Sequence, residues 1–507
     1  DASDEDLRTK HGFFAQNVYA IAARTLAAFE FALGRRVNWS CDAHQLFLVP
    51  HAREMKNAYY RREHRGLFFG YFSGPDDSVV ETCLSHDIIA HETTHAVLDG
   101  LRRRFLQAND PEQIAFHEAL ADIVALLSVF SVDEVIIASL RNAGLPEVGI
   151  NAKRTGEAIA ASGLTKLGEE FVRRVERGDD RHTAALRESL RLDPAKIRDS
   201  WGSGKDEWAD PHRRGEVLVA AVLRTLRNIW VGRIADLAPR GASLKLVAEE
   251  GARSAEHLLT MVIRSLDYAP PVEMEFEDFL DAILASDEFV APDDDKHDYR
   301  GKLREAFGAF GIKQPVSTRR DLWKDPPTYS SLNFGEFLID PDEVWRFIWQ
   351  NGEKLGIDVR NYYTRVEDVQ PSIRVGPDGL VIRETVASYI QTIEGRLSDV
   401  ISYSRVDVSE RPKDDTNKRR EALAKPVNMP EHAMVQLWGG GVLIFDQFVR
   451  PKCHQHKDVD DWARQGRRLS RLAQKAPDPD GRFGFDGADG ARLSHLHDPA
   501  ADERREW

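Results

Sequence analysis

The chain has 507 residues, 42% of them apolar and 30% charged, which is typical of a folded protein with a substantial core; its length predicts roughly three domain-sized units. The net charge of −14 argues against nucleic acid as the main partner, because phosphate binding needs a basic face. No uninterrupted apolar stretch approaches the ~20 residues of a membrane span, so no membrane association is expected.

Cysteine usage bears on the compartment in which the protein works. Cys41, Cys83 and Cys453 are too few for a disulfide framework in so long a chain. With no visible signal peptide, they favour a reducing, cytoplasmic location. The chain starts at Asp1 rather than at a methionine, so a secreted location stays open as the alternative.

The first 290 residues are predicted to be helical apart from one β-like segment. Apolar residues recur at helical spacing through residues 1–40, whereas 45–82 consist of short β-like runs broken by a Ser-Gly-Pro turn. Two long amphipathic helices follow within 84–138, separated by an Asn-Asp-Pro helix-start signal, and 150–210 are polar with weak periodicity. Three further helices are predicted, at 215–237, 244–267 and 275–286.

The C-terminal part is predicted to mix helices and strands. Residues 313–331 are rich in proline and form a linker. Beyond them, 373–382 surround a Gly-Pro-Asp-Gly turn and 433–448 surround the run Gly439-Gly440-Gly441, so both are predicted to be hairpins. The tail from 476 onward is rich in Asp, Gly, Arg and Pro and is predicted to be disordered. The expected parts are therefore 1–100, 101–312, 332–475 and the tail 476–507.

The central motif is a pair of histidines, His91 and His95, with Glu92 between them. On a helix, residues four apart lie about 40° apart around the axis, so the two imidazoles converge on one ion. Glu92 is rotated by about 100° and can instead reach a water on that ion. Neutral imidazole suits Zn²⁺, and a catalytic zinc site takes three protein ligands and leaves one position for water. The alternative is a solvent-facing helix that happens to carry two histidines.

The next predicted helix carries two acids, Glu118 and Asp122, that are also four residues apart. Ala119 and Ala121 are small and allow this helix to approach its neighbour closely. One carboxylate can complete a site of two histidines and one acid, and the other can accept the remaining N–H of a ligating imidazole. Without a metal, two acids facing two histidines in a packed helix pair would be costly.

These two segments resemble the active-site helix and the third-ligand helix of the thermolysin-like zinc metallopeptidases. The resemblance implies that His91, His95 and Glu118 bind Zn²⁺, that Glu92 is the general base and that Asp122 orients His91. It also implies a two-lobed fold, with a mixed β N-terminal lobe and a mainly helical second lobe.

Further matches concern the substrate. Asn57 and Ala58 resemble the family's edge strand, which holds an extended peptide by β-strand addition. His212 lies in a segment similar to the one that bears the family's catalytic histidine, which would donate to the oxyanion. Arg191 is similar to the arginine that contacts the substrate carbonyl, with a solvated arginine as the alternative. Two acids could orient the histidine, Asp210 and Glu207.

Three positions depart from the family pattern. Residues 99–117 lack the tyrosine that also stabilises the oxyanion. Val129 stands where an acid of the family's calcium cluster is expected, so no calcium dependence is expected. His117 stands where an asparagine often precedes the third ligand, so no supporting role is expected for it.

The sequence thus predicts an α+β zinc metalloendopeptidase with an extra C-terminal α+β domain. A metal-activated water, with Glu92 as general base, would hydrolyse peptide bonds in a peptide or protein substrate. The alternative is a zinc-containing binding or scaffold protein with weak or no peptidase activity, whose C-terminal domain engages a protein partner. The missing tyrosine favours this alternative, whereas Glu92 and His212 favour the enzyme.

Overall fold

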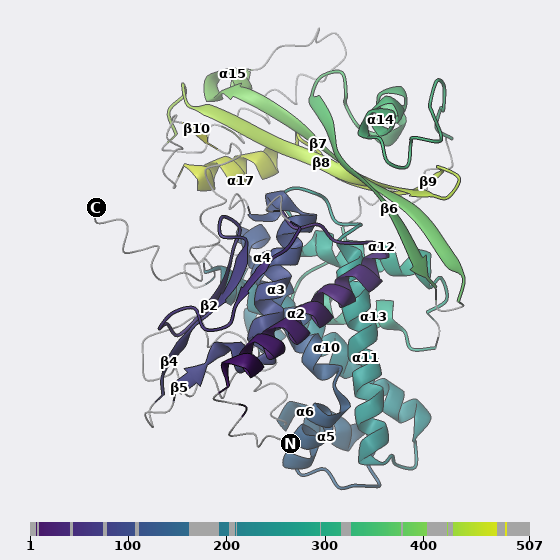
Figure 1. The fold of residues 1–507 in the computed structure, drawn as a ribbon. Coiled ribbons are helices and arrows are strands. Elements are labelled where there is room, and N and C mark those ends of the chain that lie inside the picture. Colours follow the sequence, from purple (N-terminus) through teal and green to yellow (C-terminus); the bar gives the residue numbers. More distant parts are fainter. Residues whose placement is uncertain are drawn as a thin grey trace.

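The computed structural model is a mixed α+β protein, which confirms the predicted class; a helical body is covered by one large sheet (Figure 1). The structure describes the whole chain apart from residues 1–6, 8–9, 41–43, 75–78, 107–110, 162–191, 202–207, 209, 295, 316–325, 377–378, 403–422, 424–428, 474–481 and 484–507. Most of the predicted linker 313–331 and most of the predicted tail therefore lie outside the described residues.

The N-terminal part consists of one long helix and two small sheets. Its elements are α2 (His11–Leu33), β1 (Phe47–Val49), β2 (Ala58–Arg61), β3 (Gly66–Phe69), β4 (Tyr71–Ser73), β5 (Val79–Glu81) and η1 (Thr82–Leu84). The helix α2 ends at Gly34, whose left-handed φ of 68° lets its N–H bond to the Glu30 carbonyl. In the three-stranded sheet the order is β1-β3-β2, so β2 is an edge strand.

The helical body is built around α4, which packs against α3, α10 and α11. Its elements are α3 (His86–Leu101), η2 (Arg103–Leu106), α4 (Pro111–Phe130), α5 (Asp133–Asn142), α6 (Ala152–Ala161), α9 (Pro194–Ile197), α10 (Pro211–Leu237), α11 (Leu244–Ser265), α12 (Phe276–Val290) and α13 (Tyr299–Ala309). The three helices predicted after residue 210 are confirmed. The first of them starts earlier than predicted, because the Asp210 side chain caps it and Pro211 fits its first turn.

Helix α4 is apolar and long enough to cross a membrane by composition. However, 89% of its most apolar window is buried inside the protein, as expected for the central helix of a core. Such burial follows from its sequence, since Leu120, Ile123 and Leu127 cover one face while Ala119 and Ala121 allow close contact on another.

The C-terminal part adds a five-stranded sheet. Its elements are α14 (Pro341–Leu355), β6 (Tyr363–Val375), β7 (Val381–Arg396), α15 (Leu397–Ser402), β8 (Met434–Asp446), β9 (Pro451–Lys457), α17 (Trp462–Leu472) and β10 (Arg482–Phe483). The strand order is β10-β8-β7-β6, with β9 also pairing with β8. The hairpin predicted at 373–382 is confirmed, because β6 and β7 pair up to Val375 and Val381 on either side of the turn.

The hairpin predicted at 433–448 is wrong, because β8 runs straight through the three glycines. A Cβ at Gly439 would lie 2.5 Å from the Val459 nitrogen, and one at Gly440 would lie 2.4 Å from the Tyr389 carbonyl oxygen. The glycines therefore allow neighbouring backbone to approach this strand closely, rather than turning the chain. The disorder predicted for the tail is also wrong at β10, which pairs with β8 in parallel.

The sheet lies between the helical body and α14. Val386, Val442 and Ile444 on one face belong to the main hydrophobic core together with the helices. On the other face, Phe445 packs with Phe347 of α14. The C-terminal part is therefore joined to the helical body by a shared core.

Two cysteines in the described residues, Cys83 and Cys453, are buried thiols. Burial, together with a smaller contribution from the Glu81 carboxylate, raises the pKa of the Cys83 thiol to about 12. At about pH 8 only a trace of Cys83 is thiolate, which is the reactive form. We therefore expect a Cys41→Ser variant to show no thiol that reacts with a disulfide reagent in the native state and two after unfolding. Rapid native labelling would contradict the buried positions.

Candidate metal centre

The two histidines and one acid predicted as metal ligands come together between α3 and α4. The Nε2 atoms of His91 and His95 lie 2.9 Å apart, and the Glu118 Oε2 atom lies 3.7 Å and 3.6 Å from them, respectively. Only 1% of the Glu118 side chain and 6% of the His95 side chain are exposed. These three residues could therefore hold a metal ion.

The other ring nitrogen of each histidine is held from outside the cluster. His91 Nδ1 lies 2.8 Å from the Asp122 carboxylate, as the sequence predicted. His95 Nδ1 lies 2.9 Å from His117 Nδ1. With both Nδ1 atoms engaged in this way, both Nε2 atoms face the same point with Glu118, which is the arrangement that a metal ion needs.

His117 is the first residue whose contacts the sequence reasoning missed. Complete burial lowers the pKa of His117 to about 3, and the neighbouring His95 contributes to the shift. A neutral His117 can accept at Nδ1 from the His95 Nδ1–H, and in that tautomer His95 Nε2 keeps the lone pair that a metal would use. The expectation that His117 supports nothing is therefore wrong. The signal available in the sequence was that His117 immediately precedes Glu118, a predicted metal ligand.

The cluster is rich in negative charge. Burial works to lower the pKa of His91, but hydrogen bonds with Asp122 and Glu118 outweigh it and raise the pKa well above its ordinary value. The pKa of His212 is also raised. Burial works to lower it, but the Glu118 carboxylate outweighs this effect. The carboxylates thus favour positive charge at the centre, which fits a site built for a cation.

Glu92 lies between α3 and the edge strand β2. Its Oε2 atom accepts a 2.8 Å hydrogen bond from the Tyr60 N–H, and 3% of the residue is exposed. Alternate residues of a strand direct their main-chain groups to the same side, so Ala58, two residues before Tyr60, faces α3 as well. Asn57 precedes it, and its Oδ1 accepts from the Ala58 N–H at 2.9 Å. The predicted substrate strand therefore contacts the predicted general base.

His212 reaches the cluster from the first turn of α10. Its Nε2 lies 3.4 Å from Glu118 Oε2, and its Nδ1 lies 3.8 Å from the Asp210 carboxylate. The structure thus places Asp210, one of the two acids left open by the spacing, beside this histidine. Glu207 and Arg191 lie outside the described residues.

Asp99 is the second residue missed by sequence reasoning. It is fully buried on α3 and accepts hydrogen bonds from the Tyr60 hydroxyl and from Arg62 Nε, both at 2.8 Å, and also from Ser40. Burial and the Asp99 carboxylate together raise the pKa of the Tyr60 hydroxyl. Asp99 therefore ties β2 to the helix that carries His91 and His95. Its position eight residues after His91 placed it on the same helix face.

A second acidic group, at the start of α14, serves the helix itself. Asp340 caps α14 by accepting from the Asp342 N–H at 2.9 Å. Glu343 accepts from the Asn333 N–H and pairs with Arg346. These contacts account for Asp340 and Glu343, two of the three acids in the cluster with Glu336, as groups that hold the start of α14.

The chain was compared with protein-family models, with curated proteins and with solved structures, and no match was found in any of the three. No relative therefore lends an activity to this site. What the site can do has to be argued from its own residues, their geometry and their burial.

Two substitutions of His117 distinguish the effect of its hydrogen bond on metal binding from the effect of its size. We expect His117→Leu to weaken metal binding by about 10–100-fold, because His95 loses the acceptor that fixes its ring. His117→Asn keeps an acceptor oxygen and should bind metal within a few-fold of the wild type. Competition titration against a chromophoric chelator measures both. Equal affinity of the leucine variant and the wild type would show that His117 does not hold His95.

Proposed function

We propose that this protein is a zinc-dependent endopeptidase of the thermolysin-like type. The observation that carries the proposal is that two imidazole Nε2 atoms and the Glu118 carboxylate come together between two helices, with His212 3.4 Å from that carboxylate. Two nitrogen ligands and one carboxylate oxygen form a ligand set that catalytic zinc sites use. In this proposal, residues 1–100, with α2, the small sheets and α3, form the first lobe, and residues 101–312, which are mainly helical, form the second.

His91, His95 and Glu118 would hold the zinc, with Asp122 and His117 fixing the two rings. A bound zinc ion would supply Lewis acidity, which polarises a peptide carbonyl and lowers the pKa of water. Glu92 is held by the Tyr60 N–H and would take the proton of the attacking water and pass it to the leaving amine.

His212 would donate a hydrogen bond to the oxyanion that forms when water adds to the carbonyl. Its Nε2 lies 3.4 Å from Glu118 Oε2, which supports this role, and Asp210 lies close enough to orient it. The Tyr60 hydroxyl donates to Asp99, so this proposal assigns the hydrogen bond to the oxyanion to His212 rather than to Tyr60.

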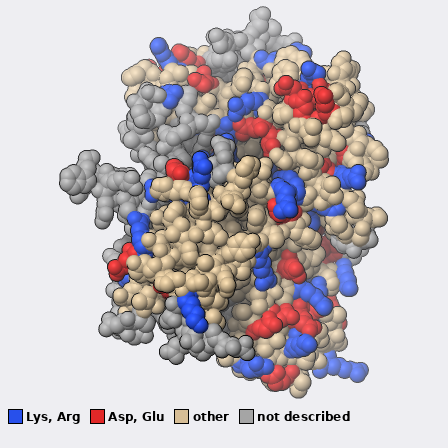
Figure 2. All heavy atoms as spheres, in the orientation of Figure 1, with Lys and Arg blue, Asp and Glu red and all other residues tan. Residues whose placement is uncertain are grey.

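The substrate would be a peptide or protein segment that adds to the free edge of β2. Asn57 and Ala58 would hold its backbone, as extended peptides are held at other sheet edges. We propose no nucleic-acid or membrane partner: on the face in Figure 2, lysines and arginines are interspersed with acidic side chains. Cys83 and Cys453 are buried thiols, which supports a cytoplasmic location.

A peptide library read by mass spectrometry tests the proposal. We expect cleavage at internal peptide bonds, loss of cleavage after treatment with a chelator, and recovery when zinc is added back. Cleavage that persists in the chelated, metal-free protein would contradict the proposed mechanism. No cleavage by the zinc-loaded protein across the library would contradict the enzyme itself.

A partner-binding role for the C-terminal part is the second candidate. One observation favours it, namely a pocket of about 530 Å³ on the side of the sheet that faces the helical body. Its lining includes Trp438, Tyr362 and Ile390, together with Arg104 of η2, which stacks over Trp438 at 4.1 Å. If the wild type and a Glu92→Gln variant both bind zinc and neither cleaves the library, the binding role becomes the better account of the chain.

A further inference from the structure

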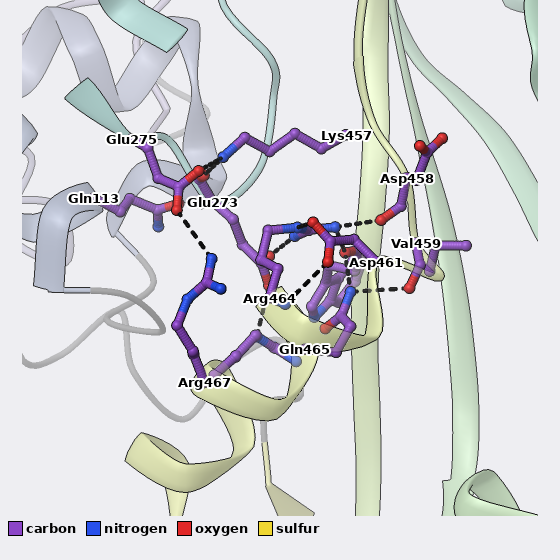
Figure 3. Close-up of polar contacts among 12 residues, drawn as sticks. Gln113, Glu273, Glu275, Lys457, Asp458, Val459, Asp461, Arg464, Gln465 and Arg467 are labelled. Atoms are coloured by element: carbon purple, nitrogen blue, oxygen red, sulfur yellow. Dashed lines mark hydrogen bonds and ion pairs between the residues drawn. The ribbon is translucent and has the colours of Figure 1, made fainter. Parts of the chain in front are cut away.

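The turn between α11 and α12 joins the C-terminal sheet region to the metal-binding helices. Glu273 in this turn adopts a left-handed φ of 50°, and 5% of the residue is exposed. Its carboxylate forms ion pairs with Arg464 and Arg468 of α17, the latter at 2.8 Å (Figure 3 shows Glu273 and Arg464). A non-glycine residue in this backbone region is held there by its surroundings.

A third cation from the C-terminal part holds the same turn. Lys457 of β9 donates to the Glu273 carbonyl at 2.6 Å and pairs with Glu275 at 2.8 Å (Figure 3). It also pairs with Asp278 at 2.7 Å. Lys457 is 8% exposed, Arg464 6% and Arg468 1%. Buried charges of this kind are strongly unfavourable when a partner is removed, so the turn and the C-terminal part are fixed to each other.

The other side of the turn contacts the first turn of α4. The Phe276 N–H donates to the Glu112 carboxylate at 3.1 Å, and the Met274 N–H donates to Gln113 Oε1 at 3.4 Å. Gln113 also donates to the Arg104 carbonyl at 2.9 Å. Glu118 lies on the same helix, six residues after Glu112, which is about 9 Å at the helical rise per residue.

The same contact extends to the helix that carries His212. Glu112 lies 3.6 Å from the guanidinium of Arg214, two residues after His212. Arg214 in turn donates to the Trp208 carbonyl at 3.0 Å. The turn around Glu273 therefore contacts α4 directly and α10 through Glu112. These two helices carry Glu118 and His212 of the proposed active site.

We propose that Glu273 and the cations of α17 and β9 form a strut by which the C-terminal part positions Glu118 and His212. The C-terminal part is then a structural component of the metal site rather than a detachable module. This inference rests on the proposed metal site, and Glu273, Arg464 and Arg468 are positioning residues that touch neither metal nor substrate. A metal ligand that is displaced by a fraction of an ångström contributes much less to metal affinity. Removal of the ion pairs that form the strut should therefore weaken metal binding.

The test compares Arg468→Met with Arg300→Met in the full-length chain. Arg300 pairs with Asp287 at 2.9 Å at the opposite end of α12, so its loss also breaks a buried ion pair but does not touch α4 or α17. We expect Arg468→Met to raise the zinc dissociation constant about tenfold. Arg300→Met should leave it within twofold at a similar loss of thermal stability, and Arg468→Lys should restore most of the affinity.

Hydrogen exchange provides a readout that does not depend on zinc. Amides in the first turns of α4 and α10 should exchange faster in Arg468→Met than in Arg300→Met, with or without metal. If Arg468→Met does not fold, Gln113→Leu tests the neutral part of the same contact and should change both readouts in the same direction. Unchanged exchange in α4, with zinc affinity equal to that of the control, would overturn the strut. A wild type that binds no zinc, but shows the exchange difference, would overturn the proposed function and leave the strut standing.

Discussion

Glu92→Gln is expected to lower kcat/KM for peptide hydrolysis by about 10²–10⁴-fold while leaving the zinc content unchanged. Glutamine keeps an oxygen that can accept the Tyr60 N–H now bonded to Glu92 at 2.8 Å, so the local fold should survive. It cannot take a proton from water at neutral pH, so the general base is lost. The loss should appear in kcat, because Glu92 acts on the reacting water rather than on the bound peptide backbone.

The measurement is steady-state cleavage of a peptide identified from the library, with metal content determined on the same samples. Glu134→Gln, an exposed change on α5, makes the same chemical substitution away from the site and should behave as the wild type. If the zinc-loaded Glu92→Gln variant retains more than a tenth of the wild-type kcat, Glu92 is not the general base.

Glu118→Ala is expected to remove the metal almost entirely. It deletes one of three ligands and leaves a buried pair of imidazoles 2.9 Å apart, so the loss of affinity should exceed the 10–100-fold typical of residues that only support a ligand. Because an ion that binds only the folded state raises its stability, zinc should increase the melting temperature of the wild type but not of this variant.

Calorimetric titration with zinc and thermal unfolding with and without zinc check this prediction. His86→Ala is the control, since His86 lies on α3, the helix that carries His91 and His95, but bonds to Ser128 at 3.0 Å, outside the cluster. It should keep the zinc-induced stabilisation. An equal zinc response in Glu118→Ala and the wild type would show that the ion, if bound, lies elsewhere.

Short-range spacing predicted the parts of the site that lie on single helices. Residues four apart share a helix face, so the pairings of His91 with His95 and of Glu118 with Asp122 followed from the sequence. The contact of Asp122 with His91 joins two helices and was expected only from family resemblance. The approach of His212, more than ninety residues after Glu118, was expected only from family resemblance, because it depends on how α10 packs on α4.

The failures have a common cause, since each depended on what approaches a residue from another element. Consecutive glycines suggested a turn, yet Gly439 and Gly440 are needed because Val459 and Tyr389 lie against the strand. His117 was given no role, because its contact with His95 depends on how two helices face each other. The sequence likewise gave no sign that the C-terminal sheet lies close to the metal-binding helices, since the contacts around Glu273 join residues about 160 to 195 positions apart.

The most direct measurement of the metal centre is a crystal structure of the zinc-loaded protein with anomalous scattering recorded on both sides of the zinc absorption edge. We predict one strong zinc peak about 2.0–2.2 Å from His91 Nε2, His95 Nε2 and a Glu118 carboxylate oxygen. A map without a peak between α3 and α4, or with zinc bound only at other residues, would contradict the metal site and the function built on it.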